Sequence, residues 1–423
     1  MKMKRMLATV VSASMLFGMT AFADTETPVT GKMITDEDVS LEIWMINERE
    51  QHFTEAIAAY QEIHPNVEIE ISYFDTSTMK NNCMASAASG TMPDCFYSYS
   101  GAIGSYYALN GFAINLDEYA SENDWENIFR EEALELAKWD GSIYGIPMTY
   151  NTFDVLYRLD IFEELGLSEP ETWDDFENCL AVLKENGITP FAIGNSSAWD
   201  LSRLFSFTLD AIAGNEEYDK LCKEQTADWS TNEYVKATLE KLKEWYDKGY
   251  FLDGFMTLEP NDARNLWYAG EAAMRVDGFI WNMISNDREM SDYGVFHLPS
   301  YNEGQTTRCS TYNTCVMINP EVSDDQFAVA IDFFEYALTN PDFDGYKSYP
   351  VSYKAVTHPD VEGFELLEEI LDDNTTYGTM PTIDTALSTE VFAQLNSAME
   401  MYLSGTVSVE EAAGMVQSQL EAE

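Results

Sequence analysis

Basic side chains are scarce in this chain. Its 423 residues include 23 Lys and Arg against 74 Asp and Glu, which gives a formal charge of −51. A surface this acidic repels phosphate backbones and anionic lipid headgroups, so the composition argues against a nucleic-acid or membrane-surface partner. Hydrophobic residues still make up 45% of the chain, so we expect a folded protein with a large core, divided into two domains.

Long apolar runs are also missing, with one short exception at the start of the chain. Three basic residues precede an apolar stretch at 6–19, and small residues then flank a cleavage position before Asp24. This order predicts a secretory signal peptide at residues 1–23. No later stretch reaches the roughly 18 apolar residues of a membrane span, and no Cys stands at the cleavage position. We therefore expect a protein exported to the periplasm or the cell exterior without a lipid anchor.

The six cysteines do not define a disulfide framework. Cys309 and Cys315 flank a strand-like stretch, which would hold them roughly 20 Å apart, too far for a disulfide. Cys83 and Cys95 are separated by the turn signals Gly90 and Pro93, so a helix and the next strand could bring their sulfurs together. A Cys83–Cys95 disulfide and buried free thiols both remain open.

Motifs for metal, phosphate and nucleophilic chemistry are missing as well. Only four His occur, and the chain has no HExxH and no CxxC pattern. Residues 194–198 read GNSSA instead of GxSxG, and no phosphate-binding glycine motif is found. Among 74 carboxylates, no catalytic pair can be selected from sequence alone. We expect a protein that is not an enzyme and that holds neither a metal ion nor a cofactor.

What the sequence does contain is a regular alternation of strand and helix patterns. In the first part of the chain we expect strands at 39–46, 67–74 and 94–100 and helices at 50–64, 78–89 and 102–109. Such alternation predicts an α/β fold with a mostly parallel sheet covered on both faces. Ligand sites in these folds lie at the carboxyl ends of the strands.

A second α/β unit follows without a Pro- or Gly-rich linker. Strand-like stretches stand at 143–158, 189–194, 272–276, 293–298 and 315–319, and helical patterns at 160–165, 173–186, 204–213, 232–248, 260–269 and 324–338. The missing linker indicates that the two units are not separate domains on a tether.

Aromatic and uncharged polar residues gather where the strands are expected to end. Examples are Trp44, residues 98–100, Tyr150, Trp199 and Trp281. A pyranose ring has an apolar face that packs on an aromatic ring and an edge of hydroxyl groups that hydrogen-bond to polar side chains. The residues at the strand ends therefore suit a sugar.

Several motifs occur in one fixed order along the chain. They are GTMPD at 90–94, YGIP at 144–147, YRLDIFEELGL at 157–167, ETWDDF at 171–176 and GEAAM at 270–274, four residues before Gly278. In this combination the chain resembles the family 1 extracellular solute-binding proteins of bacterial ABC importers. The resemblance spans nearly all of the chain that follows the signal peptide.

This resemblance implies the two-lobed periplasmic-binding-protein fold of type II, in which each lobe is a mostly parallel sheet flanked by helices. Lobe one would contain residues 36–147 and 308–345, and lobe two would contain 148–307 and 346–423. A monomer of this kind holds its solute in the cleft between the lobes, closes by a hinge motion and delivers the solute to permease subunits. The solute implied here is a carbohydrate, most simply an oligosaccharide.

The resemblance also places ligand contacts in the loops after the strands. Glu48 would accept hydroxyl hydrogen bonds and Arg49 would donate them. Near the end of the chain, Glu390 and Val391 stand where maltose-binding protein, a member of this family, has an aromatic pair. The full set of implied ligand-binding residues is Asn47, Glu48, Arg49, Asp75, Ser98, Tyr99, Ser100, Tyr150, Asn151, Asn195, Trp199, Trp281, Ser310, Tyr312 and Asn313.

Two other functions remain open from the sequence. The acidity would also suit a binder of a cationic solute such as a polyamine, because carboxylates and aromatic rings bind amines. A secreted glycoside hydrolase would need two carboxylates roughly 5 to 9.5 Å apart across one glycosidic bond.

Overall fold

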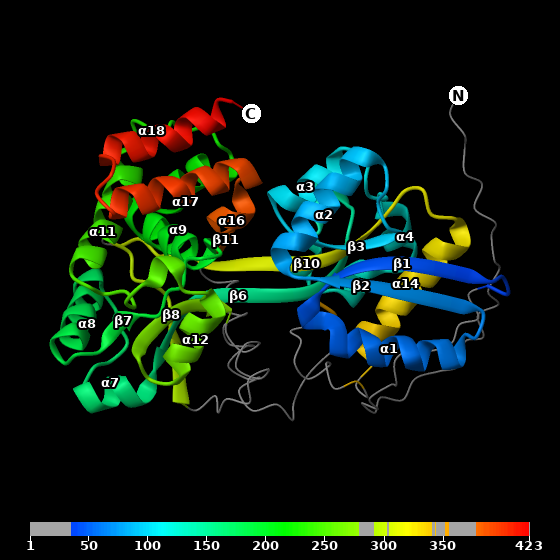
Figure 1. Ribbon diagram of the computed structural model, residues 1–423, viewed down its shortest axis with the longest axis horizontal. Coiled ribbons are helices and arrows are strands. Elements are labelled where there is room, and N and C mark those ends of the chain that lie inside the picture. The colour runs from blue at the N-terminus through cyan, green and yellow to red at the C-terminus, as the bar shows by residue number, and fades with distance from the viewer. Residues whose placement is uncertain are drawn as a thin grey trace.

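Two bodies joined by long strands make up the protein (Figure 1). The computed structural model describes residues 35–278, 292–302, 304–340, 343, 352–354 and 378–422. The predicted signal peptide and Trp281 lie outside these residues. None of the helices in the described ranges has the length and apolar character needed to cross a bilayer.

The first body contains the strand and helix alternation expected from the start of the sequence. Strand β1 pairs in parallel with both β2 and β3, and its inward residues Leu41, Ile43 and Met45 are fully buried. Figure 1 shows α2 and α3 on one side of this sheet and α1 and α14 on the other. The elements are β1 (Val39–Ile46), the 3₁₀ turn η1 (Asn47–Arg49), α1 (Glu50–Ile63), β2 (Val67–Phe74), α2 (Thr76–Ser89), β3 (Cys95–Tyr99), α3 (Ala102–Leu109), α4 (Asp117–Glu122), α5 (Trp125–Ile128), α6 (Glu131–Glu135), the hairpin β4 (Lys138–Trp139) and β5 (Ser142–Ile143), and α14 (Asp324–Thr339).

The second body is richer in helix. Its elements are α7 (Leu159–Leu165), α8 (Trp173–Glu185), β7 (Thr189–Phe191), α9 (Trp199–Ala213), α10 (Asn215–Tyr218), the π-helical turn η2 (Asp219–Lys223), α11 (Glu233–Asp247), η3 (Phe255–Thr257), α12 (Pro260–Tyr268), β8 (Ala272–Gly278), β9 (Tyr293–Phe296), β11 (Thr379–Met380), α16 (Ile383–Ala386), α17 (Thr389–Leu403) and α18 (Val409–Leu420). Helices α8, α14 and α18 each begin with a capping box, in which Thr172, Ser323 and Ser408 pair with the side chain three residues later. These caps satisfy backbone N–H groups at the helix starts.

Strands β6 (Ile146–Arg158) and β10 (Cys309–Ile318) run between the bodies, side by side and antiparallel. They join the described strands into one sheet of order β2-β1-β3-β10-β6-β8-β7, with β11 on β10 and β9 on β6. The pairs β1–β2, β1–β3 and β7–β8 are parallel, as the alternation predicts. The antiparallel pairs of this sheet all involve β6 or β10. The sheet is mixed because the chain that crosses to the second body must return in the opposite direction.

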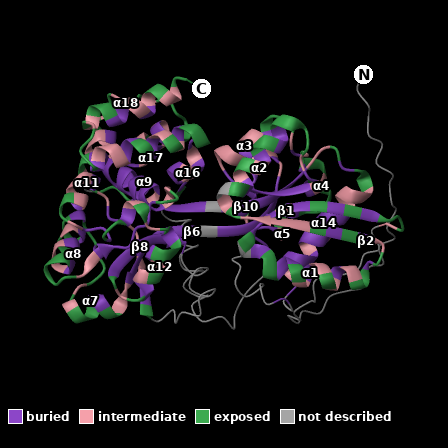
Figure 2. Cartoon of the chain, in the orientation of Figure 1, coloured by how far each residue is buried: buried purple, intermediate pink, exposed green. Residues whose placement is uncertain are grey.

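Each body has its own hydrophobic core, visible as buried segments in Figure 2. The first core takes residues from 39–148 and from 315–343 together with Tyr353, and the second takes residues from 153–298 and 380–416. The chain therefore contributes to each core twice.

Residues 352–354 lie with the first body, whereas the predicted boundary at 346 placed them in the second. The Tyr353 ring packs on Phe129 with 4.4 Å between centroids, and the Lys354 backbone N–H donates to the Ile128 carbonyl at 2.8 Å. These contacts attach the returning chain to the first core.

All six cysteines are buried free thiols, so the predicted alternative of a Cys83–Cys95 disulfide is not formed. Burial raises the pKa of the Cys83 thiol to about 12. The thiolate needed for exchange chemistry is thus disfavoured, which fits cysteines that act as small apolar side chains.

Candidate ligand-binding site

A cavity of about 620 Å³ lies between the two bodies. Its volume falls in the range of small-molecule sites, roughly 300 to 1,000 Å³. The first body contributes the carboxyl ends of β1 and β3 and the starts of α2 and α3, as expected for an α/β sheet. The lining residues are Ile46, Arg49, Asp75, Thr76, Lys80, Tyr97, Tyr99 and Ile103 from the first body and Phe153, Ser197, Trp199, Arg203, Glu259, Pro260, Asn261, Arg264, Asp277, Gly278, Thr382, Asp384, Thr385 and Phe392 from the second.

The first-body wall combines charged groups with an aromatic ring. Asp75 precedes α2, and its two carboxylate oxygens accept from the backbone N–H and the hydroxyl of Thr78 at 2.9 and 2.5 Å. One turn into α2, the Lys80 ammonium lies 4.8 Å from the centroid of the Tyr99 ring. Burial lowers the pKa of Lys80, an effect that Asp384 opposes and Arg203 reinforces. Asp75, Lys80 and Tyr99 thus give this wall an acceptor, a cation and an aromatic face.

The second-body wall is built around the start of α9. Trp199 is the first residue of this helix, and Arg203 follows four residues later on the same face. The Arg203 guanidinium lies 4.2 Å from the Trp199 ring centroid and 4.1 Å from that of Phe153. Its nearest carboxylate oxygen is that of Asp384, at 3.9 Å. The cation is therefore held mainly by two aromatic rings.

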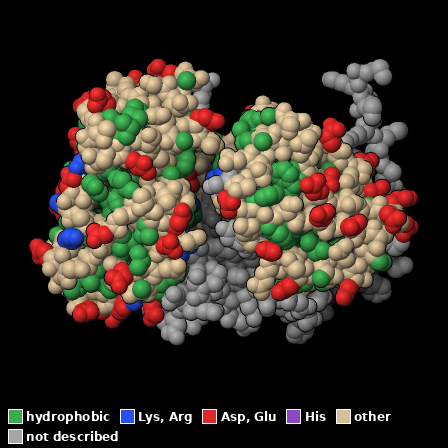
Figure 3. Space-filling view, in the orientation of Figure 1, with side chains coloured by type: hydrophobic (Ala, Val, Ile, Leu, Met, Phe, Trp, Pro, Cys, Tyr) green, Lys and Arg blue, Asp and Glu red, His purple; other side chains and the backbone are tan. Residues whose placement is uncertain are grey.

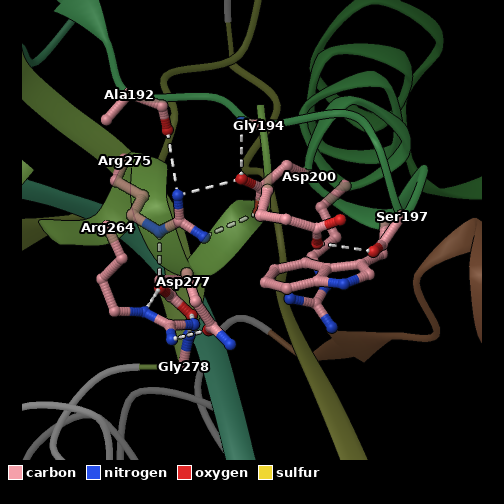
Figure 4. Close-up of polar contacts among 12 residues, drawn as sticks. Ala192, Gly194, Ser197, Asp200, Arg264, Arg275, Asp277 and Gly278 are labelled. Carbon is pink, nitrogen blue, oxygen red and sulfur yellow. Dashed lines mark hydrogen bonds and ion pairs between the residues drawn. The ribbon is translucent and has the colours of Figure 1, made fainter. Parts of the chain in front are cut away.

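Behind this wall lies a buried network of two Arg and two Asp side chains (Figure 4). Asp277 accepts from Arg264 Nε at 2.6 Å and from Arg275 Nε at 2.5 Å. Arg275 also donates to Asp200 at 2.7 and 2.9 Å, and Asp200 accepts from the Gly194 backbone at 2.9 Å. The network fixes the start of α9 against the end of β8, and both line the cavity.

The pKa of Asp277 shows which effect dominates in this network. Burial by itself would raise that pKa, but the guanidinium groups of Arg264 and Arg275 outweigh burial and hold it well below its usual range. The Asp277 carboxylate is thus ionised and its charge is compensated.

A polar edge borders the network at the start of α12. The Ser197 hydroxyl donates to Glu259 at 3.0 Å, and Arg264 donates to the Asn261 side-chain oxygen at 2.7 Å. This edge therefore offers acceptors on the Glu259 carboxylate and both donors and acceptors on the amide and hydroxyl groups.

The two bodies touch beside the cavity at Gly101, which has φ +72° and precedes α3. A Cβ atom at this position would lie 2.0 Å from the carbonyl oxygen of Thr385. Only glycine allows the bodies to approach this closely here.

Four of the predicted ligand residues line the cavity: Arg49, Asp75, Tyr99 and Trp199. Asn47 is exposed outside the set of lining residues. The side chains of Glu48, Asn151 and Tyr312 and the whole of Trp281 fall outside what the structure describes.

Six other predicted residues are buried in protein contacts away from the cavity surface. The Asn313 amide donates to the Ala133 carbonyl at 2.7 Å, while Ser100 Oγ accepts from the Asn313 backbone at 3.2 Å. The Asn195 amide donates to Glu400 at 3.0 Å. These hydrogen bonds give Ser100, Asn195 and Asn313 a structural role. The six are Ser98, Ser100, Tyr150, Asn195, Ser310 and Asn313, each at most 2% exposed.

Sequence reasoning missed most of the charged lining. Lys80 and Arg203 lie about one helical turn beyond the predicted residues Asp75 and Trp199, a spacing that could have identified them. Phe392 lies one residue after Val391, where the expected aromatic pair is missing. No sequence motif identifies Asp384, by contrast, because this residue lies on α16, far along the chain from Lys80 and Arg203, and only the fold brings it to the cavity.

The cavity is balanced in charge although the chain carries −51. Acidic side chains are spread over the outer surface of both bodies (Figure 3). Within the described part of the chain, the cavity is lined by four basic side chains, Arg49, Lys80, Arg203 and Arg264, and by four acidic ones, Asp75, Glu259, Asp277 and Asp384. In the described ranges no group of three or more His, Cys, Asp or Glu side chains could hold a metal ion.

Solved structures of similar fold cover nearly the whole chain. A chitin oligosaccharide binding protein matches with a TM-score of 0.81 at 23% identity, covering 92% of this chain and 99% of that one. A sugar transporter protein from Bacillus licheniformis in complex with stachyose matches with a TM-score of 0.72 at 17% identity, covering 90% and 98%. These likenesses show that the fold is the two-lobed fold of periplasmic solute-binding proteins, as predicted.

Curated relatives match over a shorter length. An uncharacterized ABC transporter extracellular-binding protein of Pyrococcus horikoshii is 29% identical over 287 residues, which is 65% of this chain and 64% of that protein. The multiple sugar-binding protein of Streptococcus mutans is 25% identical over 223 residues, or 51% and 52%. The chain thus spans less than two thirds of the length of these relatives. The family model of bacterial extracellular solute-binding proteins matches residues 47–342. Because this match covers more than half of the chain, the protein belongs to the bacterial extracellular solute-binding protein family.

Proposed function

We propose that this protein binds an oligosaccharide between its two lobes and delivers it, chemically intact, to the permease of an ABC importer. The observation that carries the proposal is the cavity, which both bodies line with aromatic rings and hydrogen-bonding side chains. Tyr99, Trp199 and Phe392 can pack on the apolar faces of sugar rings, and Glu259 and Asn261 can bind hydroxyl groups. Three of the similar proteins have names that refer to sugars, and these names support the choice: the chitin oligosaccharide binding protein, the sugar transporter protein in complex with stachyose and the multiple sugar-binding protein.

In this proposal the lobes close around the solute by bending of β6 and β10. Lobe one consists of residues 36–147 and 308–345 together with 352–354, and lobe two consists of 148–307 and 346–423 apart from 352–354. In the same proposal the protein acts as a monomer, is exported by the signal peptide at 1–23, and has no nucleic-acid partner.

The charged lining favours a sugar over the cationic solute that the composition left open. The described lining has as many basic as acidic side chains, so a polyamine would meet Arg49, Lys80 and Arg203 and would not find the excess of carboxylates that a cationic solute requires. For a glycoside hydrolase, turnover of a chromogenic glycoside would be required, and we expect none.

The proposal is tested by thermal unfolding of the full exported chain with a panel of neutral and acidic oligosaccharides and with spermidine. A ligand that binds only the folded state stabilises it, by about 2.7 kcal/mol at a concentration 100 times its Kd, and this raises the melting temperature. We expect at least one oligosaccharide to raise it and spermidine to have no effect. A panel without any shift would contradict carbohydrate binding.

The contact residues are tested with Trp199→Ala. Loss of the ring should weaken binding of the identified sugar by about 1 to 3 kcal/mol, the usual magnitude for a buried apolar side chain. Tyr301→Ala is the matched control, because Tyr301 is a lobe-two aromatic that is 56% exposed and lies outside the cavity. If Trp199→Ala and Tyr301→Ala bind the sugar with equal affinity, Trp199 does not contact the ligand.

A further inference from the structure

Two basic side chains from opposite lobes face the cavity, and the described residues place no carboxylate oxygen closer than 3.9 Å to either of them. Lys80 comes from α2 in the first lobe and Arg203 from α9 in the second. Among the described residues, the nearest anionic oxygen to Arg203 is that of Asp384 at 3.9 Å, and Arg203 Nε is buried without a hydrogen-bond acceptor. The ion pairs of the described part of the chain do not include Lys80, whose ammonium lies over the Tyr99 ring.

The buried cations Arg275 and Arg308 are, by contrast, paired closely with carboxylates. Arg275 lies 2.7 Å from Asp200 and 2.5 Å from Asp277, and Arg308 lies 2.7 Å from Asp210. The chain has 74 carboxylates and 23 basic residues, so a partner for each cation would be easy to supply. Shielding a cation from water without pairing it costs free energy. Such a cost is commonly retained where a ligand provides the missing partner.

The surroundings of Arg203 hold it in position for such a partner. Its guanidinium contacts the faces of Trp199 and Phe153 at 4.2 and 4.1 Å, so its planar edge, which carries the N–H donors, is the part left for hydrogen bonding. A guanidinium edge matches a carboxylate or another planar or tetrahedral oxyanion. Among the described residues, Asp384 supplies one negative charge beside the positive charges of Lys80 and Arg203. These three groups together therefore carry one excess positive charge.

We propose that the solute is an acidic oligosaccharide whose anionic substituent, such as the carboxylate of a uronic acid, binds between Lys80 and Arg203. This inference rests on the proposed function as a carbohydrate-binding protein. Because the two cations belong to different lobes, an anion that contacts both favours the closed arrangement over the open one. The neutral hydroxyl groups of the same ligand bind at Glu259 and Asn261.

The test is isothermal titration calorimetry of the full exported chain with oligosaccharides in matched pairs. Oligogalacturonates, oligomannuronates and glucuronate-containing xylo-oligosaccharides are each compared with their methyl esters, which remove the charge and keep the sugar backbone. Sulfated galacto-oligosaccharides form a further arm, which separates sulfate from carboxylate as the source of charge. We expect at least one acid to bind at least 10-fold more tightly than its uncharged partner.

Two variants assign the preference to the proposed groups. Arg203→Gln and Lys80→Gln should each reduce the ratio of acid to ester affinity by 10-fold or more, and Lys80→Gln keeps the test open if loss of Arg203 impairs folding. Arg158→Gln and Lys138→Gln are matched controls, because these residues pair with Asp160 and Glu135 outside the cavity. The controls should retain the ratio.

The outcomes separate this inference from the proposed function. Tight binding of neutral oligosaccharides with no preference for the acids would overturn the inference that the solute carries an anionic substituent. It would leave the proposal of carbohydrate binding intact. Binding of no sugar, acidic or neutral, would overturn both. An unchanged acid preference in both Arg203→Gln and Lys80→Gln would also overturn the proposed site.

Discussion

A single side chain, Arg275, joins three segments of the second lobe. It is fully buried on β8 and donates to Asp277, to Asp200 on α9 and to the Ala192 carbonyl. Its position explains how the start of α9, with its cavity-lining Trp199, keeps a fixed place relative to the sheet.

Replacing this side chain with an apolar one should be costly. Arg275→Met leaves Asp200 buried beside Asp277 without its main cation, so we expect the free energy of unfolding to fall by about 3 to 5 kcal/mol. Urea unfolding followed by tryptophan fluorescence measures the change. In the control Arg158→Met, the lost ion pair with Asp160 is partly exposed, and a change of about 0 to 1 kcal/mol is expected. Equal effects of the two variants would contradict the structural role of Arg275.

A second residue, His52, makes stability depend on pH. It is 3% exposed on α1, and burial, aided by the nearby Arg49 guanidinium, lowers its pKa from 6.5 to about 4. Between these two values the unfolded chain takes up a proton that the folded chain does not. The contribution of His52 to stability is therefore complete above pH 6.5 and is lost as the pH falls toward 4.

The shift in the pKa of His52 from 6.5 to about 4 corresponds to about 3 kcal/mol of stability that is lost between these two pH values. We expect the stability difference between pH 7 and pH 4.5 to be smaller in His52→Phe than in the unsubstituted chain, because Phe cannot titrate and keeps the ring contacts with Phe53 and Phe343. Denaturant unfolding at the two pH values provides the measurement. An unchanged pH dependence would show that other groups account for it.

At the scale of elements, the start of α3 in lobe one contacts α16 in lobe two. The Gly101→Ala substitution would place a methyl group 2.0 Å from the Thr385 carbonyl oxygen. We expect this variant to bind its sugar more weakly and to show less compaction with ligand in small-angle X-ray scattering. Gly111→Ala is the control, because Gly111 has a similar φ of +80° but open space around its position. Matching behaviour of the two variants would assign the effect to backbone strain instead of closure.

Elements with strong periodicity were predictable, and the site was predictable only in part. Helix α1 and strand β2 match the expected ranges because their apolar residues repeat with helical and strand spacing. Arg49, Asp75 and Tyr99, which the resemblance implied as ligand contacts, line the cavity just after or at the ends of the first three strands. Ser100 directly follows β3, yet its hydroxyl accepts from the backbone of Asn313 in the middle of β10. Sequence cannot separate the two cases, since a polar side chain satisfied by protein looks the same as one that faces a ligand.

At the scale of the whole molecule, the formal charge of −51 acts against compactness. Like charges over both lobes repel one another, and salt screens this repulsion as the Debye length falls from about 30 Å at 0.01 M to about 8 Å at 0.15 M. We expect the melting temperature to rise by several degrees over this range of NaCl. Differential scanning calorimetry without ligand tests the expectation, and a constant or falling melting temperature would contradict it.

The position of β10 in the sheet has a consequence for biosynthesis. This strand begins at Cys309, yet it lies in the middle of the sheet between β3 and β6, whose residues come from the first 158 positions. A nascent chain leaves the ribosome with this central place vacant until most of its length has been translated. Premature termination before Cys309 would leave β3 and β6 with bare backbone edges, which invite aggregation. We therefore expect the amino-terminal lobe to complete its sheet only after β10 has been synthesised.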